Sequence, residues 1–299
     1  MGLSNKVKTA LDETRLLNLG AQVLLGFKLR ATFQDGFSQL PQSSRLMDCL
    51  GQFLMALSVG LLIAPSMQNL IVERGQATNR LVRATSKYAE IALFPFAISL
   101  GLSFYIVLEH TYGMWVGTAA GLGFCLLAAI FWYGLGLVTK KGGRRMRRPQ
   151  SPTPLPKKID EMLTEARVII PGAQALFGFQ LVVILTRSFS EISPTLRFLH
   201  VAALCLVALA TILLMTPAAL HRIGYDGEDT EDFLKRASRL VVVAPIPLGL
   251  GIATDLYVAT TQASHSGVLG AAVAISTLIS LSALWYGIPL YIRNLQGHN

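Results

Sequence analysis

The sequence predicts an all-α fold: a polytopic membrane helical bundle of eight transmembrane helices, arranged as two parallel four-helix repeats. Of the 299 residues, 52% are hydrophobic and 14% are charged, against roughly a quarter charged in a soluble domain. Apolar runs of about twenty residues, which match a hydrocarbon core roughly 30 Å thick, recur along the chain. One ten-residue segment also occurs twice with few changes. Together these features indicate a duplicated membrane protein.

Seven segments are apolar and long enough to cross a bilayer. They cover residues 46–71, 88–108, 114–138, 168–186, 198–220, 240–261 and 267–292. Helices are expected throughout, because no water inside a bilayer can satisfy an open backbone. An eighth segment, Leu16 to Phe33, contains Asn18, Gln22, Lys28 and Arg30. Its apolar stretch is too short to predict a span by itself.

The internal repeat decides this eighth segment. Residues 20–29 read G-A-Q-V-L-L-G-F-K-L and residues 172–181 read G-A-Q-A-L-F-G-F-Q-L, which agree at seven of ten positions with an offset of 152. Self-similarity at a fixed spacing is the signature of duplication. The second copy is uncharged and long enough to cross, so we expect the first copy to cross as well. The predicted domains are a first repeat at 1–139 and a second at 159–299.

Basic residues predict the orientation. Residues 140–158 read K-K-G-G-R-R-M-R-R-P-Q-S-P-T-P-L-P-K-K, a basic Pro/Gly-rich linker typical of a cytoplasmic tether. With this linker inside, both termini are expected in the cytoplasm, and repeats of four spans share one orientation. The expected partner is the lipid bilayer, with anionic lipid head groups at the linker, and not nucleic acid. A homo-oligomer or a membrane complex partner remains open.

Polar residues gather on one face of the first span of each repeat. In the first copy this face carries Arg15, Asn18, Gln22 and Arg30, with Glu13 nearby. The corresponding candidate binding residues of the second copy are Glu165, Arg167 and Gln174. A polar residue within a span is costly unless it is paired or faces a cavity, so the strip should point into the bundle.

Two interpretations of this strip remain open. It could form a hydrophilic route or ligand site between the repeats, with Glu13 and Glu165 pairing to arginines at the cytoplasmic mouth. It could instead hold neighbouring helices together, as glutamines often do in membrane bundles.

Other ionisable residues lie in or near the spans without a matching partner in the other repeat. Asp255 is the most notable and joins the candidate binding residues, because it lies inside a span. His200 is expected to satisfy its own hydrogen bonds near the outer surface. No spacing fits a metal site, and the P-loop, H-E-x-x-H and G-x-S-x-G motifs are missing from the sequence. We therefore predict no catalytic residue, metal or cofactor.

Three motifs together resemble a known family. They are the E-x-R at Glu13 and Glu165, the G-A-Q-x-L-x-G-F that follows each, and P-A-A-L-H-R ending at His221 and Arg222. In this combination the chain resembles an uncharacterised bacterial four-helix membrane family, a domain of unknown function, present as a tandem duplication. In the first repeat Asn69 stands where His221 would fall. The resemblance implies a bacterial inner membrane and no established activity.

The sequence leaves the function open between two main classes. One is a small transporter or channel with a polar pathway at the repeat interface. The alternative is a structural or accessory membrane protein that binds a partner complex or lipids. A membrane-embedded enzyme has the least support, because no catalytic constellation is present.

Overall fold

The structure is a computed structural model that describes residues 3–74, 76–134, 154–184, 186–223, 225 and 228–296. Across these ranges the chain forms helices joined by short turns, with no strand. Most of the predicted linker 140–158 lies outside the described residues. Its last residues are helical, because the first helix of the second half begins at Leu155.

The first half contains four long helices, two of which continue into a π-helical turn. Its elements are α1 (Leu3–Ala31), η1 (Asp35–Gln39), α2 (Gln42–Gln68), η2 (Asn69–Glu73), α3 (Asn79–Tyr112), α4 (Met114–Ala129) and η3 (Ile130–Gly134). The Thr78 side chain accepts a hydrogen bond from the Leu81 amide and so caps α3. Gly113, with φ of 94°, makes the tight turn into α4.

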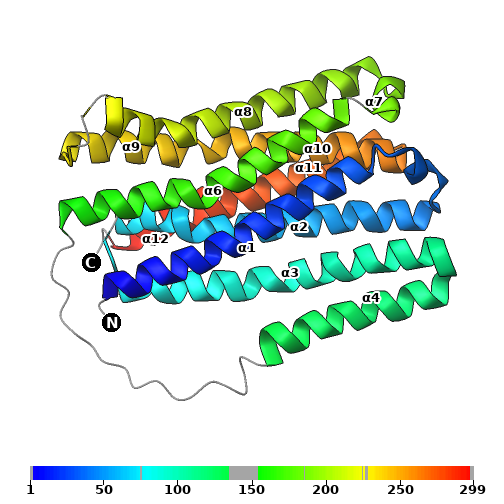
Figure 1. Ribbon diagram of the computed structural model, residues 1–299, viewed down its shortest axis with the longest axis horizontal. Coiled ribbons are helices and arrows are strands. Elements are labelled where there is room, and N and C mark those ends of the chain that lie inside the picture. The colour runs from blue at the N-terminus through cyan, green and yellow to red at the C-terminus, as the bar shows by residue number, and fades with distance from the viewer. Residues whose placement is uncertain are drawn as a thin grey trace.

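The second half repeats this order of helices. Its elements are α6 (Leu155–Ile184), α7 (Arg187–Glu191), α8 (Pro194–Ile223), α9 (Glu231–Val243), α10 (Pro245–Ser264), α11 (Gly267–Ser282), η4 (Ala283–Gly287) and α12 (Ile288–Gln296). The pair α9–α10 corresponds to α3 and is divided at Pro245, which begins α10. The long helices run along a common direction, and the first and last described residues lie at the same end of the bundle (Figure 1).

Six helices in the described part of the chain are long and apolar enough to cross a membrane. They cover Gln42–Glu73, Asn79–Tyr112, Leu155–Ile184, Pro194–His221, Glu231–Ser264 and Gly267–Leu295. The prediction of an all-α, multi-pass membrane protein is therefore confirmed. Two of the eight predicted spans are not among these six. α1 is too polar, and α4 is short at 16 residues.

The two halves meet around α1, α2, α6 and α10. α1 packs against α6, and α2 packs against α10, α11 and η4. Trp285 in η4 donates a hydrogen bond from Nε1 to the Gly60 carbonyl of α2, at 3.0 Å. The contact is asymmetric, because α4 packs mainly against α3 and lies at the lower edge of the view, away from the second half (Figure 1).

Candidate functional site: a buried polar row between the repeats

Glycines let α1 and α6 approach each other closely. A Cβ atom on Gly172 of α6 would fall 1.7 Å from Oε1 of Gln22 on α1. Gly26 of α1 is covered in the same way by the ring of Phe179 on α6. The two helices run side by side in the same general direction (Figure 1). A row of buried polar side chains at three levels follows this contact and extends from it to η2, α8 and α10.

The middle level lies on α1. Asn18 and Gln22 are both fully buried, at 0% and 1% exposure. Asn18 donates from Nδ2 to the Val168 carbonyl of α6 at 3.2 Å, and Gln22 donates to Asn18 Oδ1 at 3.1 Å. Gln22 Oε1 is buried without a hydrogen-bond partner. The level therefore joins the two repeats and retains one free acceptor.

The inner level, which lies nearest to the N-terminal end of α6, joins α6 to the π-helical turn η2. Asn69, the first residue of η2, donates from Nδ2 to Glu165 Oε1 at 2.8 Å, and Ser66 also hydrogen-bonds this carboxylate. Glu165 is fully buried, and its Oε2 has no hydrogen-bond partner. A π-turn inserts an extra residue into the helix and often marks functional positions. Here it places an amide on a buried carboxylate.

The outer level is formed by Gln180, His200 and Asp255, which we call the His200 cluster. All three are 2–3% exposed and come from α6, α8 and α10. His200 Nδ1 lies 3.0 Å from Asp255 Oδ1, and His200 Nε2 lies 3.1 Å from the Gln180 carbonyl. Gln180 Nε2 donates to the other carboxylate oxygen. The cluster ties three helices of the second repeat together.

A small pocket opens beside the His200 cluster, between the repeats. Arg30 of α1 and Phe33 of the turn after α1 line it together with Gln180, His200 and Asp255. Arg30 Nε and Gln180 Oε1 are buried without hydrogen-bond partners. The pocket thus combines a cationic donor from the first repeat with a free acceptor from the second.

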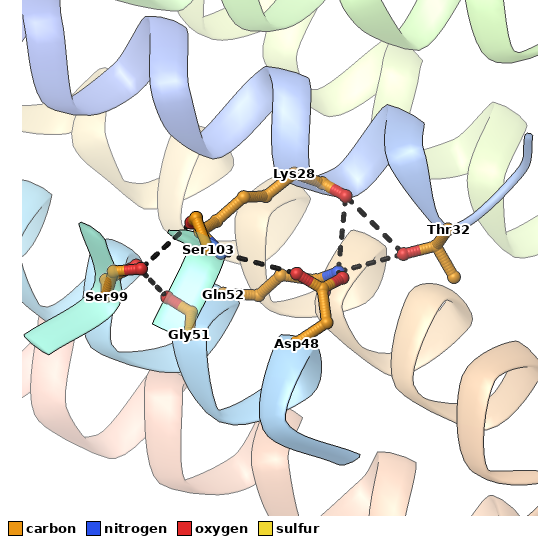
Figure 2. Close-up of polar contacts among 7 residues, drawn as sticks. All are labelled: Lys28, Thr32, Asp48, Gly51, Gln52, Ser99 and Ser103. Carbon is orange, nitrogen blue, oxygen red and sulfur yellow. Dashed lines mark hydrogen bonds and ion pairs between the residues drawn. The ribbon is translucent and has the colours of Figure 1, made fainter. Parts of the chain in front are cut away.

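A second polar cluster occupies the first repeat, and we call it the Lys28 cluster (Figure 2). Lys28 Nζ of α1 lies 3.3 Å from Asp48 Oδ1 of α2. Gln52 Nε2 donates to Asp48 Oδ2 at 2.9 Å and to Thr32 Oγ1 at 2.8 Å. Figure 2 shows these side chains converging from α1, from the turn after it and from α2, with two serines of α3 beside them.

The two clusters occupy the same place in the two repeats. Gln180 lies 152 positions after Lys28, His200 lies 152 positions after Asp48, and Asp255 lies 152 positions after Ser103. The carboxylate has therefore moved from the second helix of the repeat to the third. His200 and Asp255 thus have no residue of the same type at the matching positions of the first repeat, yet both of those positions are polar.

The structure brings together only part of the predicted strip. Asn18, Gln22 and Glu165 lie in the row, and Asp255 lies at its outer level. Glu165 bonds Asn69 and Ser66 rather than the predicted arginine. Arg15 is half-buried on α1, and the side chain of Glu13 lies outside the described residues.

Gln174 and Arg167 are exposed, so the prediction that they face inward is wrong. The reason is that α1 and α6 pack through non-equivalent faces. Gln22 covers Gly172, whereas Gly20, the counterpart of Gly172, has no atom near its Cβ position. Gln180, six residues after Gln174, takes the buried position on α6 instead.

Comparison with known proteins identifies the family and supplies no activity. No curated protein and no solved structure matches the chain. One family model matches twice, over residues 3–136 and 153–289, and is described as a family of unknown function (DUF6328). The two matches confirm the predicted tandem duplication of an unknown-function domain. The chain therefore belongs to this family of unknown function (DUF6328) and contains two copies of its domain.

Proposed function

We propose that the protein is a small transporter or channel-like membrane protein whose polar pathway follows the contact between α1 and α6. The observation that carries this proposal is a row of buried polar atoms that have no partner among the described residues: Glu165 Oε2, Asn69 Oδ1, Gln22 Oε1, Gln180 Oε1 and Arg30 Nε. Buried polar groups normally have a partner. Free ones at successive depths of a membrane protein suit a route for water or a small polar species.

The length of the row fits a membrane crossing. From Glu165 to Gln180 the helix α6 advances by about 22 Å at 1.5 Å per residue, against a hydrocarbon core of about 30 Å. Each level includes a residue of α6 or a bond to α6, and the middle level joins α6 to α1. A route at a repeat interface suits proteins in which one repeat moves against the other.

In this proposal all eight long helices cross the membrane, with both termini in the cytoplasm of a bacterial inner membrane. α1 falls short in hydropathy because of residues such as Asn18, Gln22 and Lys28, yet these bond within the bundle and avoid lipid. α4 continues into η3, which extends its apolar length. The positive-inside bias gives the orientation.

Flux through proteoliposomes tests the proposal with a matched pair of variants. Purified protein is reconstituted, and passage of protons, potassium, chloride and urea is followed separately. We expect Gln22→Leu to abolish the flux of the permeant species, because it removes the middle level. Gln174→Leu should retain it, because Gln174 is the repeat counterpart of Gln22 but is exposed.

Two outcomes contradict the proposal. One is that no species crosses faster than in protein-free liposomes. The other is that both glutamine variants, folded to the wild-type melting temperature, conduct as well as wild type.

The exposed position of Gln174 favours one alternative, a structural or accessory protein that binds a partner helix or a second copy. An amide on a lipid-facing surface lacks partners, and a neighbouring helix could supply them. Gln174 has only a long contact, 3.8 Å, to the Met215 sulfur. Cross-linking of Gln174→Cys in native membranes tests this alternative, and a chain that remains monomeric without a cross-link contradicts it.

A further inference from the structure

Both ring nitrogens of His200 face hydrogen-bond acceptors. Nδ1 lies 3.0 Å from a carboxylate oxygen of Asp255, and Nε2 lies 3.1 Å from the main-chain carbonyl of Gln180. A carbonyl oxygen can only accept, and so can an ionised carboxylate. A neutral imidazole has one N–H and one lone pair. A neutral ring beside an ionised Asp255 would therefore leave one nitrogen lone pair against an oxygen lone pair.

Only two proton arrangements satisfy this geometry. In one, His200 is an imidazolium that donates from both nitrogens and Asp255 is ionised. In the other, the Asp255 carboxyl donates to Nδ1 and the neutral ring donates from Nε2 to Gln180. Each contains one proton more than a neutral ring with an ionised carboxylate. Each leaves the pair with no net charge, which suits a site at 2–3% exposure.

We propose that His200 and Asp255 form a proton-binding site, and that the species carried along the row is a proton. The site itself follows from the His200 geometry, and only the movement of the proton rests on the proposed function. The close packing of the interface supports this choice of species. Gly172 and Gly26 are each covered by a side chain of the opposite helix, which leaves a row of hydrogen-bonding groups rather than a wide channel.

Release of the proton loosens one helix contact. When the N–H or O–H bond breaks, its electron pair stays on the nitrogen or oxygen, and a water molecule in the adjoining pocket accepts the proton. Arg30 Nε and Gln180 Oε1 offer the polar partners that such a water needs. The ring can then donate to Asp255 or to the Gln180 carbonyl, but not to both. The link of α8 to α6 or to α10 is therefore lost as pH rises.

The side chains around His200 come from several elements. Arg30 of α1 lines the same pocket as the imidazole. α7 contributes Phe189, whose ring centre lies 5.3 Å from the imidazole, and the turn after α1 contributes Phe33 at 6.0 Å. Besides Asp255, α10 contributes Tyr257, which packs against the apolar cluster that contains Phe33 and Phe189. Asp255 is the carboxylate that bonds the ring directly.

The Lys28 cluster does not depend on a bound proton. Lys28 and Asp48 neutralise each other when both have their ordinary charges, so no shared proton is needed. The two repeats thus contain one static charge pair and one pair whose neutrality depends on a bound proton.

Nuclear magnetic resonance of the ring nitrogens tests the proton site directly. Full-length protein labelled with ¹⁵N-histidine is placed in lipid nanodiscs and titrated from about pH 5 to 9. The His200 signal is assigned by its disappearance in His200→Gln. We expect either two protonated nitrogens or an Nδ1 hydrogen-bonded to a carboxyl proton at the acidic end. The proton should then be lost as pH rises, and Asp255→Asn should change the titration.

A His200 signal typical of a neutral ring beside an ionised carboxylate at every pH would overturn the proposal. The wild-type titration decides this point even where Asp255→Asn fails to fold. Proton flux measured with a pH dye inside liposomes should fall roughly a hundredfold in His200→Gln. A His200 that titrates in a protein without proton flux would contradict proton movement along the row, but not the proton-binding site. Flux of another solute beside a non-titrating His200 would overturn this inference and leave the proposed function intact.

Discussion

Lys28 and Asp48 form an ion pair in the interior of the bundle, with side chains 10% and 9% exposed. Removing two charges from water costs several kcal/mol per ion, and their attraction repays this cost only when the geometry is good. Gln52 supplies an additional hydrogen bond to the carboxylate. The pair therefore depends on the presence of both partners, which makes its contribution to stability measurable.

Removal of one partner should destabilise the fold more than removal of both. We expect Lys28→Met and Asp48→Leu each to reduce the free energy of unfolding by about 3–5 kcal/mol, because each leaves a buried charge unpaired. The double variant should recover most of this loss. Unfolding in detergent across the four proteins gives the coupling energy. Additive losses in the double variant would show that the pair is not coupled.

Single residues show where sequence reasoning stopped. Asp255 was predictable as an outlier, because a carboxylate within a span needs a partner. The expectation that His200 satisfies its own hydrogen bonds near the outer surface is wrong, because His200 is buried and bonds Asp255. Applying the spacing of 152 to all polar residues pairs His200 with Asp48 and exposes the relation. Asn69 was noted as a departure from the motif, and its bond to Glu165 required the fold.

The helices α1 and α6 depend on glycine for their contact. Gly172 lies under Gln22, where a Cβ atom would overlap with the amide oxygen, whereas Gly178 on the same helix has no atom within 4 Å of its Cβ position. The two positions share a helix and a residue type. They differ in what a methyl group would meet.

This difference predicts opposite effects of one substitution. Gly172→Ala should lower the unfolding free energy by about 1–3 kcal/mol, because overpacking forces Gln22 to move. Gly178→Ala should be neutral or stabilising by up to about 1 kcal/mol, because alanine is the better helix former. Thermal unfolding in detergent, with the two variants side by side, measures both. Equal melting temperatures for the two variants would contradict the close contact.

The sequence predicts where the helices lie along the chain better than it predicts which side of each helix is buried. Apolar length located seven of the helical segments, α4 among them, and the repeat located α1. The inward side of α6 was not predictable, since Gln174 and Gln180 are both polar and only packing decides which one is buried. The π-turn at Asn69 was also missed, because its sequence resembles that of an ordinary helix.

At the scale of the whole molecule, the two repeats have the same order of helices but different surroundings. α2 is enclosed by α10, α11 and η4 of the second half. Its counterpart α8 is largely exposed along its membrane window, with 28% of the window buried against 67% for α2. The duplication therefore produced one inner and one outer copy of the same helix.

The proposed topology predicts which loops are accessible from outside the cell. In a background without Cys49, Cys125 and Cys205, Ser38→Cys should react with a membrane-impermeant maleimide on intact cells, because η1 follows α1 on the outer side. Glu228→Cys, between α8 and α9, should react only after permeabilisation. Both positions are exposed in the structure. Labelling of both sites on intact cells would rule out the eight-span arrangement.

The carboxylate that changed helix between the repeats has a mechanical consequence. Loss of a proton can unlatch only the half with the imidazole, since the Lys28–Asp48 ion pair of the other half needs no shared proton. Any movement driven by protons would therefore be asymmetric. The first repeat would keep its helix contacts, and the second would change them. A chimaera assembled from two second halves would have two proton-dependent His–Asp contacts and no Lys–Asp ion pair.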